Sequence, residues 1–374
     1  MRKKLIIAPM VLSLLLSFQT FSYGEEKNAS KGSDNAAASS ENKRQLNVGN
    51  YREIESGMEP VVYQPSHVEG RTSNGLSNPL RGLYTTGITD TTPITYTIGA
   101  PVMNTPKVYL IWYGSWKTTP VAPASAPVSK DYSNFMLKLL KDLAGSTRWS
   151  NIIQPYYSKI NSIKKNIGAL AASTTANQVF IPTNTATYGS SLSQSSILKI
   201  AKAGFPTVDA NGVYLVLTSA DISVPGFNAG TIQFCGWHSF EQASGRKYGF
   251  VGDSANATWC QPQTTSQNGA GPDAVASVLV HEIEEAVTDP QLNAWWSSQS
   301  NGSENADKCA WSWGLTNTTS NTVNASNYSW GSTSTNYLIQ QEFKLGTITP
   351  LAIKNNRTGV TTNYDSATGT CALN

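Results

Sequence analysis

Apolar runs and amphipathic segments alternate along the chain from about residue 98 to its end. Four short apolar runs rich in β-branched and aromatic residues are typical of buried strands: 108–113, 177–181, 212–218 and 247–252. Apolar residues at helical spacing predict helices over 131–143, 195–203 and 271–289. This order predicts a single-domain α/β fold, with a central mixed sheet and the last of these helices packed against it.

The helix over 271–289 is the stretch around which we expect a functional site. Pro272 suits its first turn, where a missing N–H costs nothing, and Pro290 ends it because proline cannot continue the hydrogen-bond ladder. One face is apolar, with Ala276, Leu279, Val280, Ile283 and Val287. At about 100° per residue, the opposite side collects His281, Glu282, Glu285 and Asp289. We expect the helix to bury the first face and to present the second, with Glu284 solvated on its flank.

The spacing within this polar sector is that of a metal-binding helix. His281 and Glu285 lie one turn apart and can reach one ion, and Glu282 is placed to take a proton from a metal-bound water. This is the logic of the HExxH zinc helix, with glutamate in place of the second histidine. Glu304 follows Glu285 by 304 − 285 = 19 residues, close to where one large group of zinc peptidases places a glutamate as third ligand. The sequence therefore predicts a zinc-peptidase-like layout.

The third ligand and the metal are open at this point. His238, in the string CGWH directly after a strand, competes with Glu304 because it would complete the His₂Glu set of zinc peptidases. Oxygen ligands alone, from Glu285, Asp289, Glu304 and Asp307, would instead suit Ca²⁺. The alternative without a metal is a solvated acidic helix face. Acidic residues and histidines are rare in this chain, with 24 and 3 respectively, so their clustering on one helix argues against a merely solvated face.

The N-terminal quarter of the chain has the composition of export and linker sequence. A basic start, a short apolar run and small residues before Gly24 predict a signal peptide over 1–24, hence an extracellular or periplasmic protein. Residues 25–45 hold no large apolar side chain, which predicts a disordered linker. A loop-rich arm over 46–97 then leads into the domain at 98–374. No later stretch is long and apolar enough to predict a transmembrane segment.

Composition and cysteine number favour an exported protein without a nucleic-acid partner. Charged residues make up 14% of the chain, and its net charge is only +3, too little to favour nucleic acid or an anionic membrane. Four cysteines in an exported chain predict disulfides, for which three pairings exist. We favour Cys235–Cys260 with Cys309–Cys371, because these close the shortest consecutive loops. The second bridge would tie down a loop-rich C-terminal part.

The segment over 295–331 is rich in Asn, Ser, Thr and Trp, and we expect it to be loop-like. Exposed tryptophans there would offer aromatic faces to a polysaccharide: Trp295, Trp296, Trp311 and Trp313. The alternative is that these rings bury the helix and the second disulfide. The last apolar stretch, 337–343, predicts an edge strand or a short helix.

A series of strings between Val108 and Cys371 follows the order of a known family. The strings are VYLIWYGSW, VYLVLTSADISVPGF, CGWH, YGFVGDS, a helix ending in VTDP and a terminal cysteine. They resemble the Exordium family, also called phosphate-induced protein 1. The resemblance implies a secreted or cell-wall protein; plant members are linked to growth promotion, and no biochemical activity is settled for the family. The pair His281–Glu282 is similar to a microbial HExxE branch and departs from the plant helix, so the plant role is not carried over.

Two functions follow as expectations. The first is a secreted metal-dependent hydrolase of the peptidase type, with Glu282 as general base at a zinc ion held by His281, Glu285 and either Glu304 or His238. The second is a non-catalytic extracellular or cell-envelope protein, in which zinc or calcium stiffens the loop after the helix and the tryptophans bind polysaccharide. The expected partner is accordingly a peptide or a polysaccharide.

Overall fold

The structure, a computed structural model, describes most of one compact unit of the chain, Ile54–Asn374. The predicted signal peptide, the linker and most of the arm lie outside the described residues. The described residues are 61–62, 91–116, 132–181, 187–228, 234–254, 257–262, 268–297, 304–314, 317–318, 325–326, 328–329, 336–354 and 359–374.

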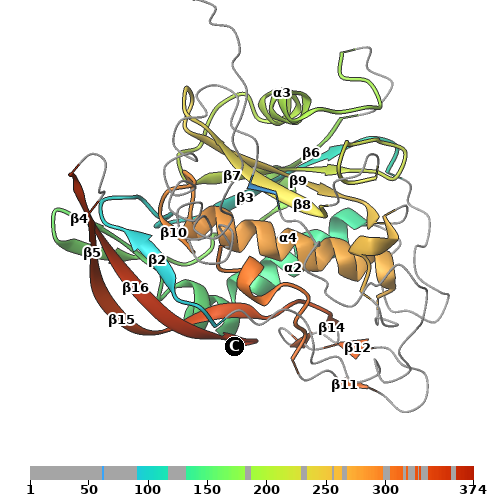
Figure 1. Ribbon diagram of the computed structural model, residues 1–374. Coiled ribbons are helices and arrows are strands. Elements are labelled where there is room, and N and C mark those ends of the chain that lie inside the picture. The colour runs from blue at the N-terminus through green and yellow to red at the C-terminus, as the bar shows by residue number, and fades with distance from the viewer. Residues whose placement is uncertain are drawn as a thin grey trace, which may run out of the picture. The chain divides into compact units, whose positions relative to one another are not determined.

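A six-stranded mixed sheet lies at the centre of this unit, in the order β1-β8-β9-β7-β3-β6 (Figure 1). Its strands are β1 (Val61–Val62), β3 (Lys107–Tyr113), β6 (Gln178–Ile181), β7 (Gly212–Thr218), β8 (Gly236–Glu241) and β9 (Arg246–Gly252). Strands β3, β6, β7 and β9 run parallel, whereas β8 is antiparallel to both β9 and β1. The mixed α/β fold and its four predicted strands are confirmed. We expected His238 directly after a strand, but it lies inside β8.

Three helices cover the two faces of this sheet: α2 (Tyr132–Ala144), α3 (Gln194–Gly204) and α4 (Ala270–Thr288). Helix α3 packs on one face, and α4 packs on the other with α2 beside it (Figure 1). Each helix matches its prediction to within one residue at either end. Helical turns η2 (Trp149–Ile153), η3 (Thr175–Asn177), η5 (Thr258–Cys260) and η6 (Asp307–Cys309) complete the helical structure of the described residues.

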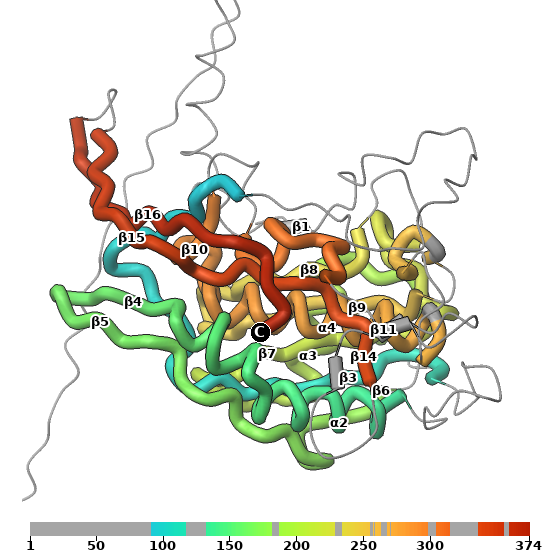
Figure 2. The backbone as a smooth tube through the Cα atoms, turned by 90° about the horizontal axis from the view of Figure 1, so that it is seen from below, coloured from blue at the N-terminus to red at the C-terminus, as the bar shows by residue number. Residues whose placement is uncertain are grey.

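A second sheet, antiparallel throughout, has the order β10-β2-β16-β15 (Figure 2). Its strands are β2 (Ile94–Thr97), β10 (Trp295–Trp296), β15 (Glu342–Lys354) and β16 (Thr361–Ala372). Strand β2 falls in the predicted arm, so the folded part begins before residue 98. The long β15–β16 hairpin was not predicted, because its strands are largely exposed and lack a regular apolar alternation.

Shorter hairpins complete the strands. β4 (Tyr157–Ile160) pairs with β5 (Ile163–Asn166), β11 (Asn317–Thr318) with β12 (Ala325–Ser326), and β13 (Tyr328–Ser329) with β14 (Asn336–Tyr337). The stretch 337–343, for which we predicted one edge strand or short helix, instead ends β14 and begins β15. The stretch 295–331, predicted to be loop-like, contains only short strands and the turn η6 among its described residues.

Two disulfides pair all four cysteines in the predicted way, Cys235 with Cys260 and Cys309 with Cys371. The second bridge joins η6 to β16 and so ties the end of the chain to the segment after α4. Such bonds persist in oxidising compartments. None of the helices in the described part of the chain has the length and apolar character of a membrane span.

Two of the four predicted tryptophans after α4 are buried. Trp295 is fully buried and packs its ring against Tyr96 and Tyr156. Trp313 is also buried and meets the ring of Trp311 edge-on. A polysaccharide surface made of all four predicted tryptophans is therefore wrong, since buried rings cannot stack on a sugar.

Candidate metal centre

Helix α4 is buried on all sides, from Gly271 to Thr288. The sheet covers its apolar face, while the segment after residue 304 and the start of β15 cover its polar face. The backbone N–H of Asp307 donates to Glu285 Oε1 at 3.1 Å, and the Thr288 hydroxyl donates to Asn305 Oδ1 at 3.0 Å. The predicted exposure of the polar face, and with it the alternative of a solvated acidic face, is therefore wrong.

A glycine lets α4 approach β8 closely. A Cβ atom on Gly236 would lie 2.6 Å from Glu282 Oε1 and 2.6 Å from a methyl carbon of Val278, which is closer than real Cβ contacts occur. Two residues further along β8, the side chain of His238 reaches the polar side of α4. The strand thus supplies a histidine to the carboxylates of the helix.

The first group of side chains consists of His238, Glu285 and Glu304, one each from β8, α4 and the segment after α4. His238 Nδ1 lies 3.5 Å from Glu285 Oε2, and its Nε2 lies 3.5 Å from Glu304 Oε2. All three residues are at most 2% exposed. Among the described residues, neither ring nitrogen of His238 and neither carboxylate oxygen of Glu304 makes a hydrogen bond.

The second group consists of His281, Glu285 and Asp307. His281 Nε2 lies 3.1 Å from Glu285 Oε1 and 3.5 Å from Asp307 Oδ1. Asp307 is held by its neighbour, because the Glu304 N–H donates to Asp307 Oδ2 at 3.2 Å. Glu285 belongs to both groups, with one oxygen turned toward each histidine.

Each group could hold a divalent metal ion. In each group, one ligand atom per residue can be chosen so that all of them lie within 4.8 Å of one another. Ligand atoms bound to zinc at about 2.0–2.1 Å in a tetrahedron lie about 3.3 Å apart. His281 Nε2 and Glu285 Oε1, at 3.1 Å, are near that separation. His238 faces Glu285 with Nδ1 and Glu304 with Nε2, so its ring would give only one of these nitrogens to a single ion. Buried imidazole and carboxylate atoms without hydrogen bonds are also costly unless something else satisfies them.

Glu282 stands beside the first group, with Oε2 3.5 Å from His238 Nδ1. Its Oε1 is buried and accepts no hydrogen bond from the described residues. Burial raises the pKa of Glu282 to about 7 against the opposing effect of the two histidines. A carboxylate tuned to that range can both accept and return a proton near neutral pH.

The charges of the cluster depend strongly on one another. Burial alone would lower the pKa of His238, but the surrounding Glu304, Glu282 and Glu285 outweigh it and hold the pKa well above its usual value. Burial would raise the pKa of Glu285, but His281 and His238 outweigh it and lower the pKa to about 2. Burial raises the pKa of Glu304 well above its usual value. Without a cation, the carboxylates therefore compete for protons and for the histidines.

Asp289 closes α4 and lies beside Glu304 and His238 of the first group, without belonging to either group of three. Its Oδ1 accepts from the N–H groups of Asn293 and Ala294 at 2.5 and 2.6 Å. Burial raises the pKa of Asp289 to about 6 despite these bonds. This is the role of a carboxylate that binds the chain's own amides at a helix end, one of the two roles we considered for it.

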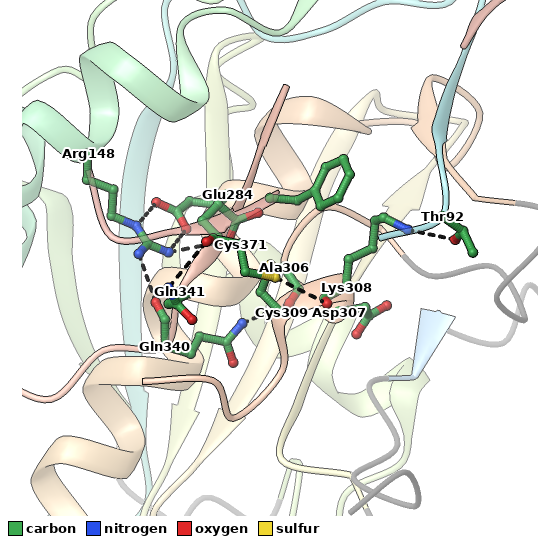
Figure 3. The surroundings of a disulfide bond; sticks show 12 residues. Thr92, Arg148, Glu284, Ala306, Asp307, Lys308, Cys309, Gln340, Gln341 and Cys371 are labelled. Carbon is green, nitrogen blue, oxygen red and sulfur yellow. Dashed lines mark hydrogen bonds and ion pairs between the residues drawn. A yellow bond between two sulfur atoms is a disulfide. The ribbon is translucent and has the colours of Figure 1, made fainter. Parts of the chain in front are cut away.

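Glu284 is buried, contrary to our prediction that it is solvated, because Arg148 neutralises it (Figure 3). Arg148 donates Nε and Nη2 to the two oxygens of Glu284 at 2.7 and 2.6 Å. It also donates Nη1 to the carbonyl of Gln340 at 2.8 Å, and its Nη2 lies 3.3 Å from Glu342 Oε2. This guanidinium fastens α4 to the start of β15.

Cys309 and Cys371 fasten the other part of the covering segment (Figure 3). The bridge follows directly after Asp307 and Lys308. Lys308 directs its ammonium to Thr92 Oγ1 at 3.0 Å. These two contacts hold the turn η6, which begins at Asp307, to β16 and to Thr92.

The predicted site residues all lie in this cluster, though not in the predicted arrangement. His281 and Glu285 are close, as the spacing indicated, but Glu304 faces His238. Asp307, which we considered only as a calcium ligand, faces His281. The pairing of Arg148 with Glu284 was not predicted, because the sequence around an arginine does not indicate that its side chain is buried.

Comparisons with known proteins match most of the domain to a single family. A family model described as the phosphate-induced protein 1 conserved region matches residues 94–343. Three Arabidopsis thaliana proteins are similar over about half of the chain. Protein EXORDIUM-like 3 is 26% identical over 229 residues, 54% of this chain and 63% of that protein.

Protein EXORDIUM-like 5 is 22% identical over 231 residues, 54% of this chain and 60% of that protein. Protein EXORDIUM is 26% identical over 227 residues, 55% of this chain and 69% of that protein. The chain thus spans less than two thirds of the length of the first two relatives. No solved structure matches the chain.

Proposed function

The chain belongs to the family of the phosphate-induced protein 1 conserved region, as its motifs predicted, and on that premise we propose that it is a secreted metal-dependent hydrolase of the peptidase type. The printed names of the relatives state no reaction. The proposal therefore rests on the chemistry of the residues around α4.

One observation carries the proposal. His238 is buried among three carboxylates, Glu282, Glu285 and Glu304, each with an oxygen 3.5 Å from a ring nitrogen. Neither nitrogen makes a hydrogen bond within the described residues. A buried imidazole without such hydrogen bonds, surrounded by carboxylate oxygens, supports a metal site because a bound cation would satisfy these buried polar atoms.

We propose that His238, Glu285 and Glu304 hold a zinc ion. Bound there, zinc would polarise a carbonyl group and make a water molecule more acidic. Two carboxylates weaken that second effect by lowering the positive charge at the ion. A base beside the site is therefore needed for hydrolysis.

Glu282 is the proposed general base. Its Oε1 accepts no hydrogen bond from the described residues, which leaves this oxygen available to take a proton from an attacking water. The same carboxyl group would then return the proton to the leaving amine of a peptide. Glutamine at this position keeps the shape of the side chain but cannot accept a proton.

Secretion is part of the proposal. Two disulfides and no free cysteine suit an oxidising compartment, and the predicted signal peptide would deliver the chain there.

A second function is favoured by the depth of the cluster. His238, Glu285 and Glu304 are at most 2% exposed, whereas a catalytic ion needs an open position for substrate. In this reading the ion only stiffens the segment after α4, and the carboxylates suit Ca²⁺ as well as zinc. The protein would then be a non-catalytic extracellular protein.

Metal content and turnover separate the two functions. We would measure bound metal by elemental analysis, and hydrolysis with a quenched fluorescent peptide library, for the wild-type protein and three variants. The hydrolase proposal expects bound zinc, lost in His238→Gln, and turnover that Glu282→Gln abolishes without loss of zinc. Glu241→Gln, on the same strand β8 but paired with Lys202, should keep both.

A wild-type protein that binds no divalent metal after incubation with zinc or calcium would overturn both functions. Bound metal without hydrolysis of any library member would leave the non-catalytic function.

A further inference from the structure

Glu285 turns its two oxygens to two different histidines. Oε2 lies 3.5 Å from His238 Nδ1, and Oε1 lies 3.1 Å from His281 Nε2. Each oxygen of Glu285 can therefore act as a ligand together with a different histidine. The Asp307 N–H donates to Oε1 at 3.1 Å, and this bond occupies only one of the two lone pairs of that oxygen.

Each histidine has a further carboxylate of its own. Glu304 Oε2 is 3.5 Å from His238, and Asp307 Oδ1 is 3.5 Å from His281. Two sets of one imidazole and two carboxylates therefore meet at Glu285. In each set, one ligand atom per residue lies within 4.8 Å of the others, so each set could hold one ion.

The cluster contains five buried or nearly buried carboxylates beside its two histidines: Glu282, Glu285, Asp289, Glu304 and Asp307. Carboxylates gathered this closely repel one another, and each divalent cation bound between them reduces that repulsion.

We propose that Glu285 bridges two divalent metal ions, the first held with His238 and Glu304 and the second with His281 and Asp307. The inference rests on the proposed function, which supplies the first ion. The two ions of carboxylate-bridged hydrolytic sites lie about 3.5–4 Å apart, where they can bind both ends of a reacting group.

The two positions differ in their access to solvent. The side chain of Asp307 is 16% exposed, whereas those of His238, Glu285 and Glu304 are at most 3% exposed. The second ion therefore exchanges more readily than the first. A chelator should remove it first and leave a form with one ion.

Native mass spectrometry of the folded, disulfide-bonded protein with added Zn²⁺ tests the inference directly. We expect two zinc ions per chain in the wild type and one in Asp307→Asn, which keeps the shape of the side chain but binds metal poorly. Asp365→Asn removes a buried carboxylate of the second sheet, far in sequence from either group, and should keep two. Circular dichroism and the absence of free thiols establish that each variant is folded.

One zinc per chain in the wild type at saturating Zn²⁺ would overturn the bridge and leave the proposed function standing. No zinc would overturn both. Two zinc ions that Asp307→Asn does not reduce would also overturn the assignment of the second position.

A second measurement does not depend on any variant. Two Mn²⁺ ions joined by a carboxylate at about 3.5–4 Å are magnetically coupled. The wild-type protein loaded with Mn²⁺ should therefore give the electron paramagnetic resonance spectrum of a coupled pair. A spectrum of isolated ions at full loading would refute the bridge.

Discussion

Removal of Arg148 tests how α4 is held in place. The guanidinium is buried and makes two charge-assisted hydrogen bonds to Glu284 and one to the carbonyl of Gln340. Burial raises the pKa of the nearby Glu342 well above its usual value. Arg148 and Glu284 form a buried pair of one positive and one negative charge.

The Arg148→Met substitution leaves Glu284 as a buried charge without its partner. Breaking a buried pair in this way costs about 3–5 kcal/mol of folding stability. In the double variant Arg148→Met/Glu284→Met, both charges are gone, and the main remaining loss is the carbonyl of Gln340 without its donor, about 1–3 kcal/mol. We therefore expect the double variant to be more stable than the single variant by roughly 2 kcal/mol.

Urea unfolding followed by tryptophan fluorescence, with a chelator present so that metal binding does not enter, measures these differences. Lys138→Met is the control, because it breaks a partly exposed pair with Asp142 and should cost less than about 1 kcal/mol. The reasoning is refuted if the double variant is no more stable than Arg148→Met. It is also refuted if Arg148→Met unfolds at the same urea concentration as the wild-type protein.

Three further predictions concern the segments around the cluster. Chelation should lower the midpoint temperature of thermal unfolding. Readdition of zinc at about 100 times its dissociation constant should restore about 2.7 kcal/mol of the free energy of unfolding. An unchanged midpoint in differential scanning calorimetry would argue against bound metal. The double variant Cys309→Ser/Cys371→Ser opens a loop of 62 residues, which should cost about 4 kcal/mol by loop entropy and weaken zinc binding measured by calorimetry. Unaltered zinc affinity would show that the bridge does not position the ligands. Gly236→Ala places a Cβ 2.6 Å from Glu282 Oε1 and should lower the free energy of unfolding measured in urea by about 1–3 kcal/mol. Gly245→Ala, at a turn with open space around it, lacks this clash and is the control. Equal losses of stability in the two variants would contradict the close packing of β8 on α4.

Local patterns were sufficient for elements whose character is decided within a few residues. The run GVYLVLT of β7 is buried at every position, which its continuous apolar sequence indicated. Helix α4 ends before Pro290, and its i, i+4 spacing placed His281 beside Glu285. In these cases neighbours in the sequence are also neighbours in space.

Elements and contacts made by distant parts of the chain were not predictable in the same way. Strand β16 is held by its pairing with β15 and β2, and its own residues show no apolar alternation. Arg148 and Glu284 are 136 positions apart, and no local signal joins them. The burial of the polar face of α4 depends on such contacts, so the sequence alone suggested a solvated face.

The division of ligands between the histidines shows the limit of arguments from spacing. Glu304 precedes the turn η6 and Asp307 begins it, and their carboxylates meet His238 and His281 respectively. Their distance along the sequence from Glu285 does not decide which of them meets His281. That choice depends on where β8 brings His238, which is set by strand pairing and not by the ENAD motif.

The cluster contains more carboxylates than histidines, and attraction between these two kinds of group does not by itself fix the elements that carry them. Two connections outside it do so: Arg148 binds α4 to the start of β15, and the Cys309–Cys371 bridge binds η6 to β16 (Figure 3). Because these connections keep the carboxylates close, the repulsion between them can be relieved only by protons or by cations. Ligands fixed in advance lose little freedom when an ion binds, which is how rigid scaffolds support metal sites. Residues outside the two groups, Arg148 above all, should therefore affect how tightly the proposed ions bind.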